Sequence, residues 1–158
     1  TFIAELQPKI RARLVAAESP SAAVADVDVL CTATTSSTPV FDGLHLKEGA
    51  HVNSVGSFTP AMQEIDLETV LRSRVFVDSI ASATTEPGDL IEALAAGVTS
   101  SEEWTELGAV VEGESPGRQA DDDLTLFKSV GLAVQDVAAG AVVIERAEEM
   151  GLGTVVEL

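Results

Sequence analysis

The sequence contains few of the residues that form disulfides, zinc sites and hydrolytic triads. Its 158 residues include one cysteine, Cys31, and two histidines, His45 and His51. One cysteine excludes an internal disulfide and a metal site made of several cysteines, and its place inside an apolar run predicts a buried, inert thiol. Neither histidine has a carboxylate at ligand spacing, so we expect no metal site and no catalytic triad.

Positive charge is also scarce, because nine Lys and Arg stand against 26 Asp and Glu and give a formal net charge of −17. Such a chain cannot assemble the basic face that binds nucleic acid, and anionic membranes repel it. Its apolar runs are shorter than the ~18 residues of a membrane span, and its first residues lack the pattern of a signal peptide. We therefore expect a cytoplasmic protein with no nucleic-acid partner and no membrane contact.

Several motifs that define common active sites are missing. The sequence has no G-x-G-x-x-G dinucleotide turn, no G-x-x-x-x-G-K-[ST] phosphate loop, no G-x-S-x-G nucleophile turn and no H-E-x-x-H metalloprotease helix. Hydrophobic residues nevertheless make up 46% of the chain, which suits one globular domain with a core.

What the sequence does contain is an alternation of strand-like and helix-like segments. We expect strands at 12–17, 27–34, 50–56, 75–78, 124–128 and 154–158, and helices at 22–25, 67–73, 88–96, 102–111 and 130–150. Strands separated by helices form parallel β-crossover-β units, and the apolar run 27–34 is typical of a strand buried on both faces. The expected fold class is α/β, a partial Rossmann-like doubly wound parallel sheet without its glycine-rich first turn, followed by a long helix.

Polar residues and glycines mark the ends of the expected helices. Helix N-caps are expected at Ser19 or Ser21, at Asp66, and at Ser100 or Ser101. Glycines 97 and 151 are expected to end helices. The adjacent aspartates 121–123 suggest a magnesium site, but neighbouring side chains point in different directions, which favours a solvated loop.

Small and hydroxyl-bearing residues follow two of the expected strands, where open α/β sheets bind ligands. Thr34 belongs to the Thr- and Ser-rich segment 32–37, and Gly56 allows close backbone approach. A plain loop and an ordinary turn glycine also explain these residues. Ser129, between a strand and the long helix, suits an anionic or amide-bearing ligand, or it simply caps the helix.

Longer segments of the sequence resemble one known family. In chain order they are ADVDVLCTATTS, LKEGAHVNSVGSFTPAMQEID, RVFVDS and PGRQADDDLTLFKSVGLAVQD. The parts FKSVGLA and AHVNSVG are the most specific, and the similarity extends from about residue 25 to residue 158. On these segments the chain resembles the ornithine cyclodeaminase/mu-crystallin family.

The resemblance implies an NAD(P)-binding Rossmann domain, incomplete here over residues 1–128. In residues 129–158 the long helix and a terminal strand would lead to a dimerisation domain. The resemblance also implies that the chain is the carboxyl-terminal part of a longer, homodimeric protein and is inactive by itself. NAD and NADP both stay open as cofactors.

Single positions receive implied roles from the same resemblance. The family's cofactor-contacting positions are matched by Thr34, Val55, Gly56, Ser57, Phe58 and Ser129. Val130 matches a substrate-facing position. Phe58 also stands where ornithine cyclodeaminases have a proton-transferring aspartate, and Met62 stands where they have a cofactor-contacting lysine. A phenyl ring cannot exchange a proton, so no residue of this chain is assigned as the catalytic acid.

The departure at Phe58 favours imine reduction, because hydride transfer to a small cyclic ketimine tolerates the loss of the aspartate. The expected substrate is a cyclic imino acid such as pyrroline- or piperideine-2-carboxylate. Two alternatives stay open. One is ornithine cyclodeaminase, which converts the amino acid ornithine to proline plus ammonia, and the other is a non-catalytic NAD(P)H- or ligand-binding protein.

Overall fold

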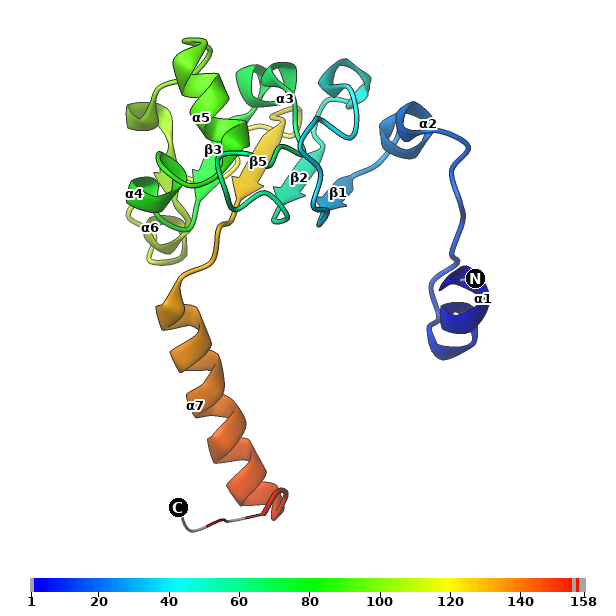
Figure 1. Cartoon of the computed structure of the whole chain (residues 1–158), viewed down its shortest axis with the longest axis vertical. Coiled ribbons are helices and arrows are strands. Elements are labelled where there is room, and N and C mark those ends of the chain that lie inside the picture. Colours follow the sequence, from blue (N-terminus) through cyan, green and yellow to red (C-terminus); the bar gives the residue numbers. More distant parts are fainter. Residues whose placement is uncertain (1, 155, 157–158) are drawn as a thin grey trace.

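A parallel sheet forms the centre of the computed structural model, which describes residues 2–154 and 156 (Figure 1). Its five strands are β1 (Val29–Thr32), β2 (His51–Ser54), β3 (Arg74–Val77), β4 (Thr105–Glu106) and β5 (Thr125–Lys128). They lie in the order β1-β2-β5-β3-β4, and every neighbouring pair is parallel. The expected α/β fold with a parallel sheet is confirmed.

Short helices connect the strands, and one long helix follows the last of them. The α-helices are α1 (Phe2–Leu6), α2 (Pro20–Val24), α3 (Leu67–Arg72), α4 (Ile80–Ala83), α5 (Gly88–Ala95), α6 (Leu107–Val111) and α7 (Ala133–Met150). The 3-10 turns are η1 (Gln7–Lys9), η2 (Gly43–His45) and η3 (Ser101–Glu103). These crossovers return the chain to the same edge of the sheet, as parallel pairing requires.

The two faces of the sheet are covered unequally. On one face, Leu30, Val52 and Leu126 are register partners, and they pack with buried apolar residues of α2, α3 and α5. The other face is open at β1, where Val29 is 57% exposed and Cys31 is exposed as well. The main hydrophobic cluster therefore lies on one side of the sheet, and Phe76 is buried on the other side.

The strand expected at 27–34 is confirmed as β1. Its expected burial on both faces is wrong, and so is the expected burial of the Cys31 thiol. β1 is an edge strand, and no described strand pairs with its outer side. A short apolar run fits a central strand and an edge strand equally well, because burial depends on what packs against it rather than on the run itself.

The expected helix caps are largely confirmed. The Ser19 side chain accepts a hydrogen bond from the Ala22 N–H and begins α2. Asp66 accepts from the Thr69 N–H and begins α3. Ser100 caps η3, and glycines 97 and 151 follow α5 and α7 with φ values of +68° and +63°.

Two expected elements differ in the structure. Segment 12–17 forms no strand, because extended chain needs a partner and no described strand pairs with it. The expected helix 102–111 is interrupted by β4, in which Thr105 pairs with Phe76 at the edge of the sheet. The expected strand 154–158 falls mostly on positions 155, 157 and 158, outside the described residues.

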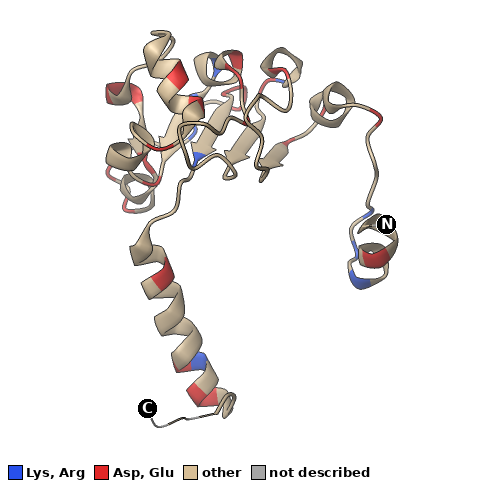
Figure 2. Ribbon diagram, in the orientation of Figure 1, with Lys and Arg blue, Asp and Glu red and all other residues tan. Residues whose placement is uncertain are grey.

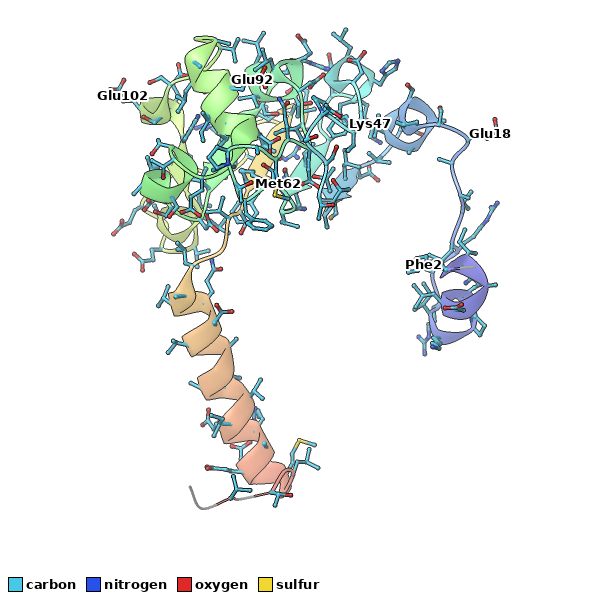
Figure 3. All side chains as sticks on the ribbon, viewed as in Figure 1. Phe2, Glu18, Lys47, Met62, Glu92 and Glu102 are labelled. Atoms are coloured by element: carbon cyan, nitrogen blue, oxygen red, sulfur yellow. The ribbon has the colours of Figure 1, made fainter. Side chains whose placement is uncertain are left out.

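Helix α7 stands away from the α/β body, and none of its residues is buried (Figure 1). It begins at Ala133 rather than at residue 130, since Gly131 has a φ of +83° that no right-handed helix accommodates. Phe2 on α1 also lies apart from the body (Figure 3) and is 72% exposed. Both ends of the described chain therefore extend beyond the core.

The acidic residues are spread over the helices and loops of the body rather than gathered in one patch (Figure 2). None of the helices within the described residues combines the length and the apolar character needed to cross a membrane.

Candidate functional site

The carboxyl ends of the strands bring the implied site residues to one edge of the sheet. The last residues of β1, β2 and β5 are register partners. Consequently Thr34 follows β1, residues 55–58 follow β2, and residues 129–130 follow β5 along the same edge. Parallel α/β sheets bind their ligands at this edge, so it is the candidate site.

Gly56 sets how closely the loops after β1 and β2 approach each other. A Cβ atom at this position would collide with the backbone N and O of Thr34 and with the Glu64 carboxylate. Only glycine therefore permits this spacing. The close approach seen here is to a neighbouring loop, and contact of Gly56 with a cofactor stays a prediction.

The side chains of this edge point in different directions. Val55 and Phe58 are 45% and 53% exposed and form an apolar lip. Ser57 is fully buried, and its hydroxyl donates to the Met62 carbonyl at 2.8 Å. Thr34 is exposed, and its hydroxyl accepts from the Ser36 N–H at 3.2 Å. The lip thus presents apolar surface beside one hydroxyl.

A buried carboxylate that was not singled out in the sequence lies under this edge. Glu64 is fully buried and accepts four hydrogen bonds, including one from the Thr34 N–H. The others come from the Gly56 N–H at 2.8 Å, the Thr32 hydroxyl at 3.0 Å and the Ser54 hydroxyl at 3.3 Å. Burial raises the pKa of Glu64, but these hydrogen bonds outweigh it and hold the pKa below its ordinary value. Glu64 is therefore an anion at neutral pH.

A buried ion pair adjoins this carboxylate. Lys128, the last residue of β5, is fully buried, and its Nζ lies 3.2 Å from Asp89 Oδ2 and donates to the Ser54 hydroxyl at 3.2 Å. Burial lowers the pKa of Lys128, and the Asp89 carboxylate opposes the shift without cancelling it. Asp89 Oδ1 accepts the N–H groups of Glu64 at 2.7 Å and Ile65 at 3.1 Å. The pair therefore fixes the backbone that carries Glu64.

Asp78, which follows β3, organises the start of the connection to α7. Its Oδ2 accepts from the Ser129 hydroxyl at 2.8 Å, the Val130 N–H at 3.1 Å and the Gly131 N–H at 2.8 Å. Ser129 does not cap α7, which begins at Ala133. An anionic or amide-bearing ligand was expected at Ser129, but here the Ser129 hydroxyl and the two N–H groups that follow it bind the Asp78 carboxylate.

Lys128, Glu64 and Asp89 were not predicted as site residues, although the sequence contained a signal for the first of them. A lysine that ends the apolar run LTLF is unusual, since a strand buried in a sheet rarely carries an unpaired charge. Glu64 and Asp89 gave no such signal, because Glu64 stands among polar residues and Asp89 lies at the start of a helix, where exposed acidic residues are common. Their burial depends on the folded loops above them.

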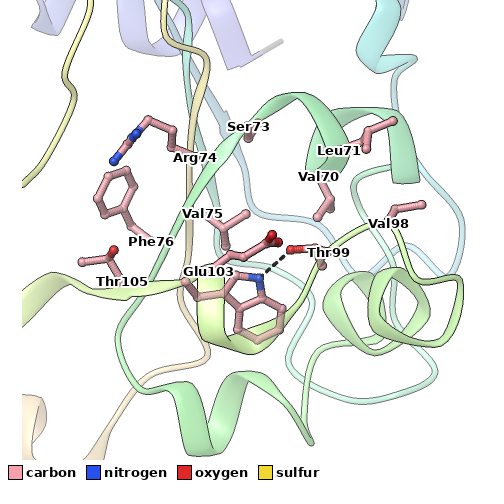
Figure 4. A pocket seen from close by; sticks show the side chains of 11 residues that line it. Val70, Leu71, Ser73, Arg74, Val75, Phe76, Val98, Thr99, Glu103 and Thr105 are labelled. Carbon is pink, nitrogen blue, oxygen red and sulfur yellow. Dashed lines mark hydrogen bonds between the residues drawn. The ribbon is translucent and has the colours of Figure 1, made fainter.

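Cavities lie at several places on the body. One of about 200 Å³ adjoins the end of β1 and is lined by Thr32, Ala33 and Thr34 among others. A second, of about 260 Å³, lies at the opposite, amino end of β3 beside Trp104 (Figure 4). Ligand pockets typically enclose about 300–1,000 Å³. Both of these cavities are smaller than that range.

The aspartates 121–123 form a turn. Asp123 Oδ2 accepts the N–H groups of Gln119 at 2.9 Å and Ala120 at 3.1 Å, while Asp121 and Asp122 are exposed. No group of three or more His, Cys, Asp or Glu side chains within the described part of the chain is arranged to hold a metal ion.

Comparison with known proteins gives one family match. The model of the ornithine cyclodeaminase/mu-crystallin family matches residues 1–151, so the matched region begins earlier than the segments recognised from residue 25. Delta(1)-pyrroline-2-carboxylate reductase from Bacillus cereus is 39% identical over 158 residues, 99% of this chain and 48% of that protein. This chain thus spans about half the length of that relative.

Solved structures agree with this match. Thermococcus litoralis Delta(1)-pyrroline-2-carboxylate reductase, in complex with NADH and L-proline, has a TM-score of 0.92 at 38% identity. The match covers 98% of this chain and 48% of that one. An archaeal alanine dehydrogenase dimer with bound NAD has a TM-score of 0.85 at 31% identity, covering 99% of this chain and 48% of that one.

Proposed function

Because this chain belongs to the ornithine cyclodeaminase/mu-crystallin family, we propose that the protein carrying it is an NAD(P)-dependent reductase of a small cyclic imino acid. The observation that carries the proposal is the exposed phenyl ring of Phe58 on the lip of the carboxyl edge. Ornithine cyclodeaminases have a proton-transferring aspartate at this position. An apolar lip favours reduction of an imine over loss of ammonia.

The residues at this edge fit the nicotinamide end of the cofactor. The exposed surfaces of Val55 and Phe58 suit the face of a flat ring, and both keep water from it. When bound, NAD(P)H supplies a hydride. The sequence has no glycine-rich turn for the pyrophosphate, so residues outside this chain hold that group.

Three further positions have distinct tasks in this proposal. The Ser129 hydroxyl donates to Asp78, which leaves its lone pairs free to accept a hydrogen bond from the nicotinamide amide. The Ser57 hydroxyl is committed to Met62, so Ser57 shapes the lip and meets the cofactor through its backbone. Val130 faces the substrate. The groups that hold the substrate carboxylate and give the proton lie outside this chain.

The proposal extends to the organisation of the whole protein. Residues 1–128 would form part of the NAD(P)-binding domain, and residues 129–158 would lead to a dimerisation domain. The exposed valines and isoleucine of α7 support this assignment, because apolar side chains on a free helix favour packing against another element. We assign the protein to the cytoplasm as a homodimer, consistent with the archaeal alanine dehydrogenase dimer.

The test uses the protein that carries this chain, with NADH and NADPH each offered alongside pyrroline-2-carboxylate and piperideine-2-carboxylate. We expect loss of absorbance at 340 nm with at least one pair and no ammonia release from ornithine. Ammonia and proline formed from ornithine would identify the protein as a cyclodeaminase and overturn the proposal. Tight binding of NAD(P)H without turnover of either imine would identify a non-catalytic binding protein, with the same consequence.

A further inference from the structure

Glu64 joins two loops that come from different strands. Its Oε1 accepts from the Thr34 N–H, in the loop after β1, and its Oε2 accepts from the Gly56 N–H, in the loop after β2. The hydroxyls of Thr32 and Ser54, at the ends of the same two strands, also donate to Oε2. One carboxylate therefore spans the gap between both loops of the candidate site.

The position of this carboxylate is itself fixed by the rest of the sheet. Asp89, in the first turn of α5, holds the backbone N–H groups of Glu64 and Ile65. Asp89 in turn pairs with Lys128 at the end of β5, and Lys128 bonds to Ser54 at the end of β2. The side chain of Glu64 thus cannot shift without disturbing contacts to three strands.

The four donors around the side chain of residue 64 require a carboxylate rather than an amide. An ionised glutamate offers acceptor sites on both oxygens and no donor, which matches four donors directed at it. A glutamine has one acceptor oxygen, and its NH₂ group would face N–H or O–H donors. An apolar side chain would remove the acceptor of two partly buried N–H groups and of the buried Thr32 and Ser54 hydroxyls, and polar groups left without a partner away from water are costly.

We propose that Glu64 is a positioning residue for the nicotinamide cofactor. It holds the loop after β1 and the loop after β2 at a fixed separation, so that Thr34 and the apolar lip of Val55 and Phe58 meet the cofactor together. This inference rests on the proposed function, because it assigns those two loops to NAD(P)H. Glu64 does not touch the cofactor or the substrate in this account.

The experiment compares Glu64→Gln with Glu92→Gln in the protein that carries this chain. Glu92 is the matched control, since it is exposed on α5 and loses the same charge, and its side chain bonds only to the Gln63 amide among the described contacts. Dissociation constants for NADH and NADPH are measured by calorimetry, and KM for the imino acid is measured separately. Thermal unfolding followed by circular dichroism identifies a temperature at which every variant is folded, and the binding measurements are made at that temperature.

We expect Glu64→Gln to raise the cofactor dissociation constant at least tenfold while the KM of the imino acid changes less than twofold. Hydrogen exchange of the Thr34 and Gly56 amides should accelerate at least tenfold in this variant. Glu92→Gln should match the wild type in all three measurements. A residue that served stability alone would lower the melting temperature without changing the affinity of the folded protein.

Other results separate the failure of this inference from the failure of the proposed function. A wild type that binds cofactor, with a folded Glu64→Gln that binds within twofold of it, overturns the positioning role and leaves the reductase assignment standing. A wild type that binds neither cofactor overturns both. If Glu64→Gln does not fold, Glu64→Asp replaces it, because aspartate keeps the charge but is too short to reach both loops. Affinity within twofold of wild type in folded Glu64→Asp also overturns the role.

Discussion

Lys128 is the residue whose environment departs most from what its chemistry favours. The fully buried ammonium group is stabilised by its contacts with Asp89 and Ser54 and by the nearby carboxylates of Glu64 and Asp78. Losing one partner of a buried pair leaves the other charge uncompensated. The strand itself was predicted from the apolar run LTLF. The burial of its lysine was not, because Asp89 lies 39 positions away in sequence and reaches it only through the fold.

Replacement of Lys128 by methionine should therefore destabilise the protein strongly. We expect Lys128→Met to lower the free energy of unfolding by about 3–5 kcal/mol, the usual cost of leaving one buried charge unpaired. Lys47→Met is the matched control, because Lys47 pairs with Asp26 and Asp28 at the surface and surface pairs contribute little. Urea unfolding measures both. Equal losses in the two variants would contradict the buried pair.

The lowered pKa of Glu64 predicts that the free energy of unfolding depends on pH. Its pKa in the folded protein lies below the ordinary value of 4.5, so the unfolded chain takes up a proton before the folded one does. The stabilisation is thus complete above about pH 4.5 and declines as the pH falls from there through the lowered, folded pKa. Unfolding free energies of wild type and Glu64→Gln should differ by a constant amount above that pH and converge below it. A difference that grows as the pH falls would have the wrong sign.

At the scale of single elements, helix ends were easier to predict from sequence than strands. Ser19 and Asp66 act through their own neighbours in the chain, so local sequence is sufficient. The predictions of a strand at 12–17 and of an uninterrupted helix at 102–111 were wrong, because strand formation depends on distant partners. Thr105 becomes part of β4 only because Phe76 lies beside it.

The connection between β5 and α7 gives a prediction about the contacts that hold a single loop. Asp78 binds the Ser129 hydroxyl and the N–H groups of residues 130 and 131. Asp78→Ala should lower the unfolding free energy by about 1–3 kcal/mol, the net contribution of a few partly exposed hydrogen bonds, and should speed hydrogen exchange at residues 130 and 131. Asp136→Ala is the control, since Asp136 is exposed in the first turn of α7. Unchanged exchange in Asp78→Ala would show that the loop is held by other contacts.

At the scale of the whole molecule, the described residues leave one edge and one face of the sheet uncovered at β1. The parallel α/β class followed from the alternation of segments along the sequence. The order of the strands did not, because it is decided by long-range pairing that no local pattern encodes. In the same way, sequence located the loops of the candidate site, while the buried charges that hold them appeared only in the folded chain.

The reactivity of the Cys31 thiol measures whether this region of β1 is covered. It is the only cysteine of the sequence and lies exposed on β1. We expect its thiol to react fully with Ellman's reagent in the 158-residue chain and to react at least tenfold more slowly in the protein that carries it, where other residues would cover β1. Equal rates in the two proteins would contradict the proposal that residues 1–128 are part of a larger domain.

β5 is the last of the described strands to be synthesised, yet it lies between β2 and β3 and pairs with both. A ribosome therefore releases β1 to β4 as two separate pairs of strands that have no contact through the sheet. Nascent chains that end before residue 128 expose the inner edges of β2 and β3, and unpaired edges invite aggregation. Translation has to pass β5 before these strands can close into one sheet, so a pause before residue 128 prolongs the exposure of the two edges.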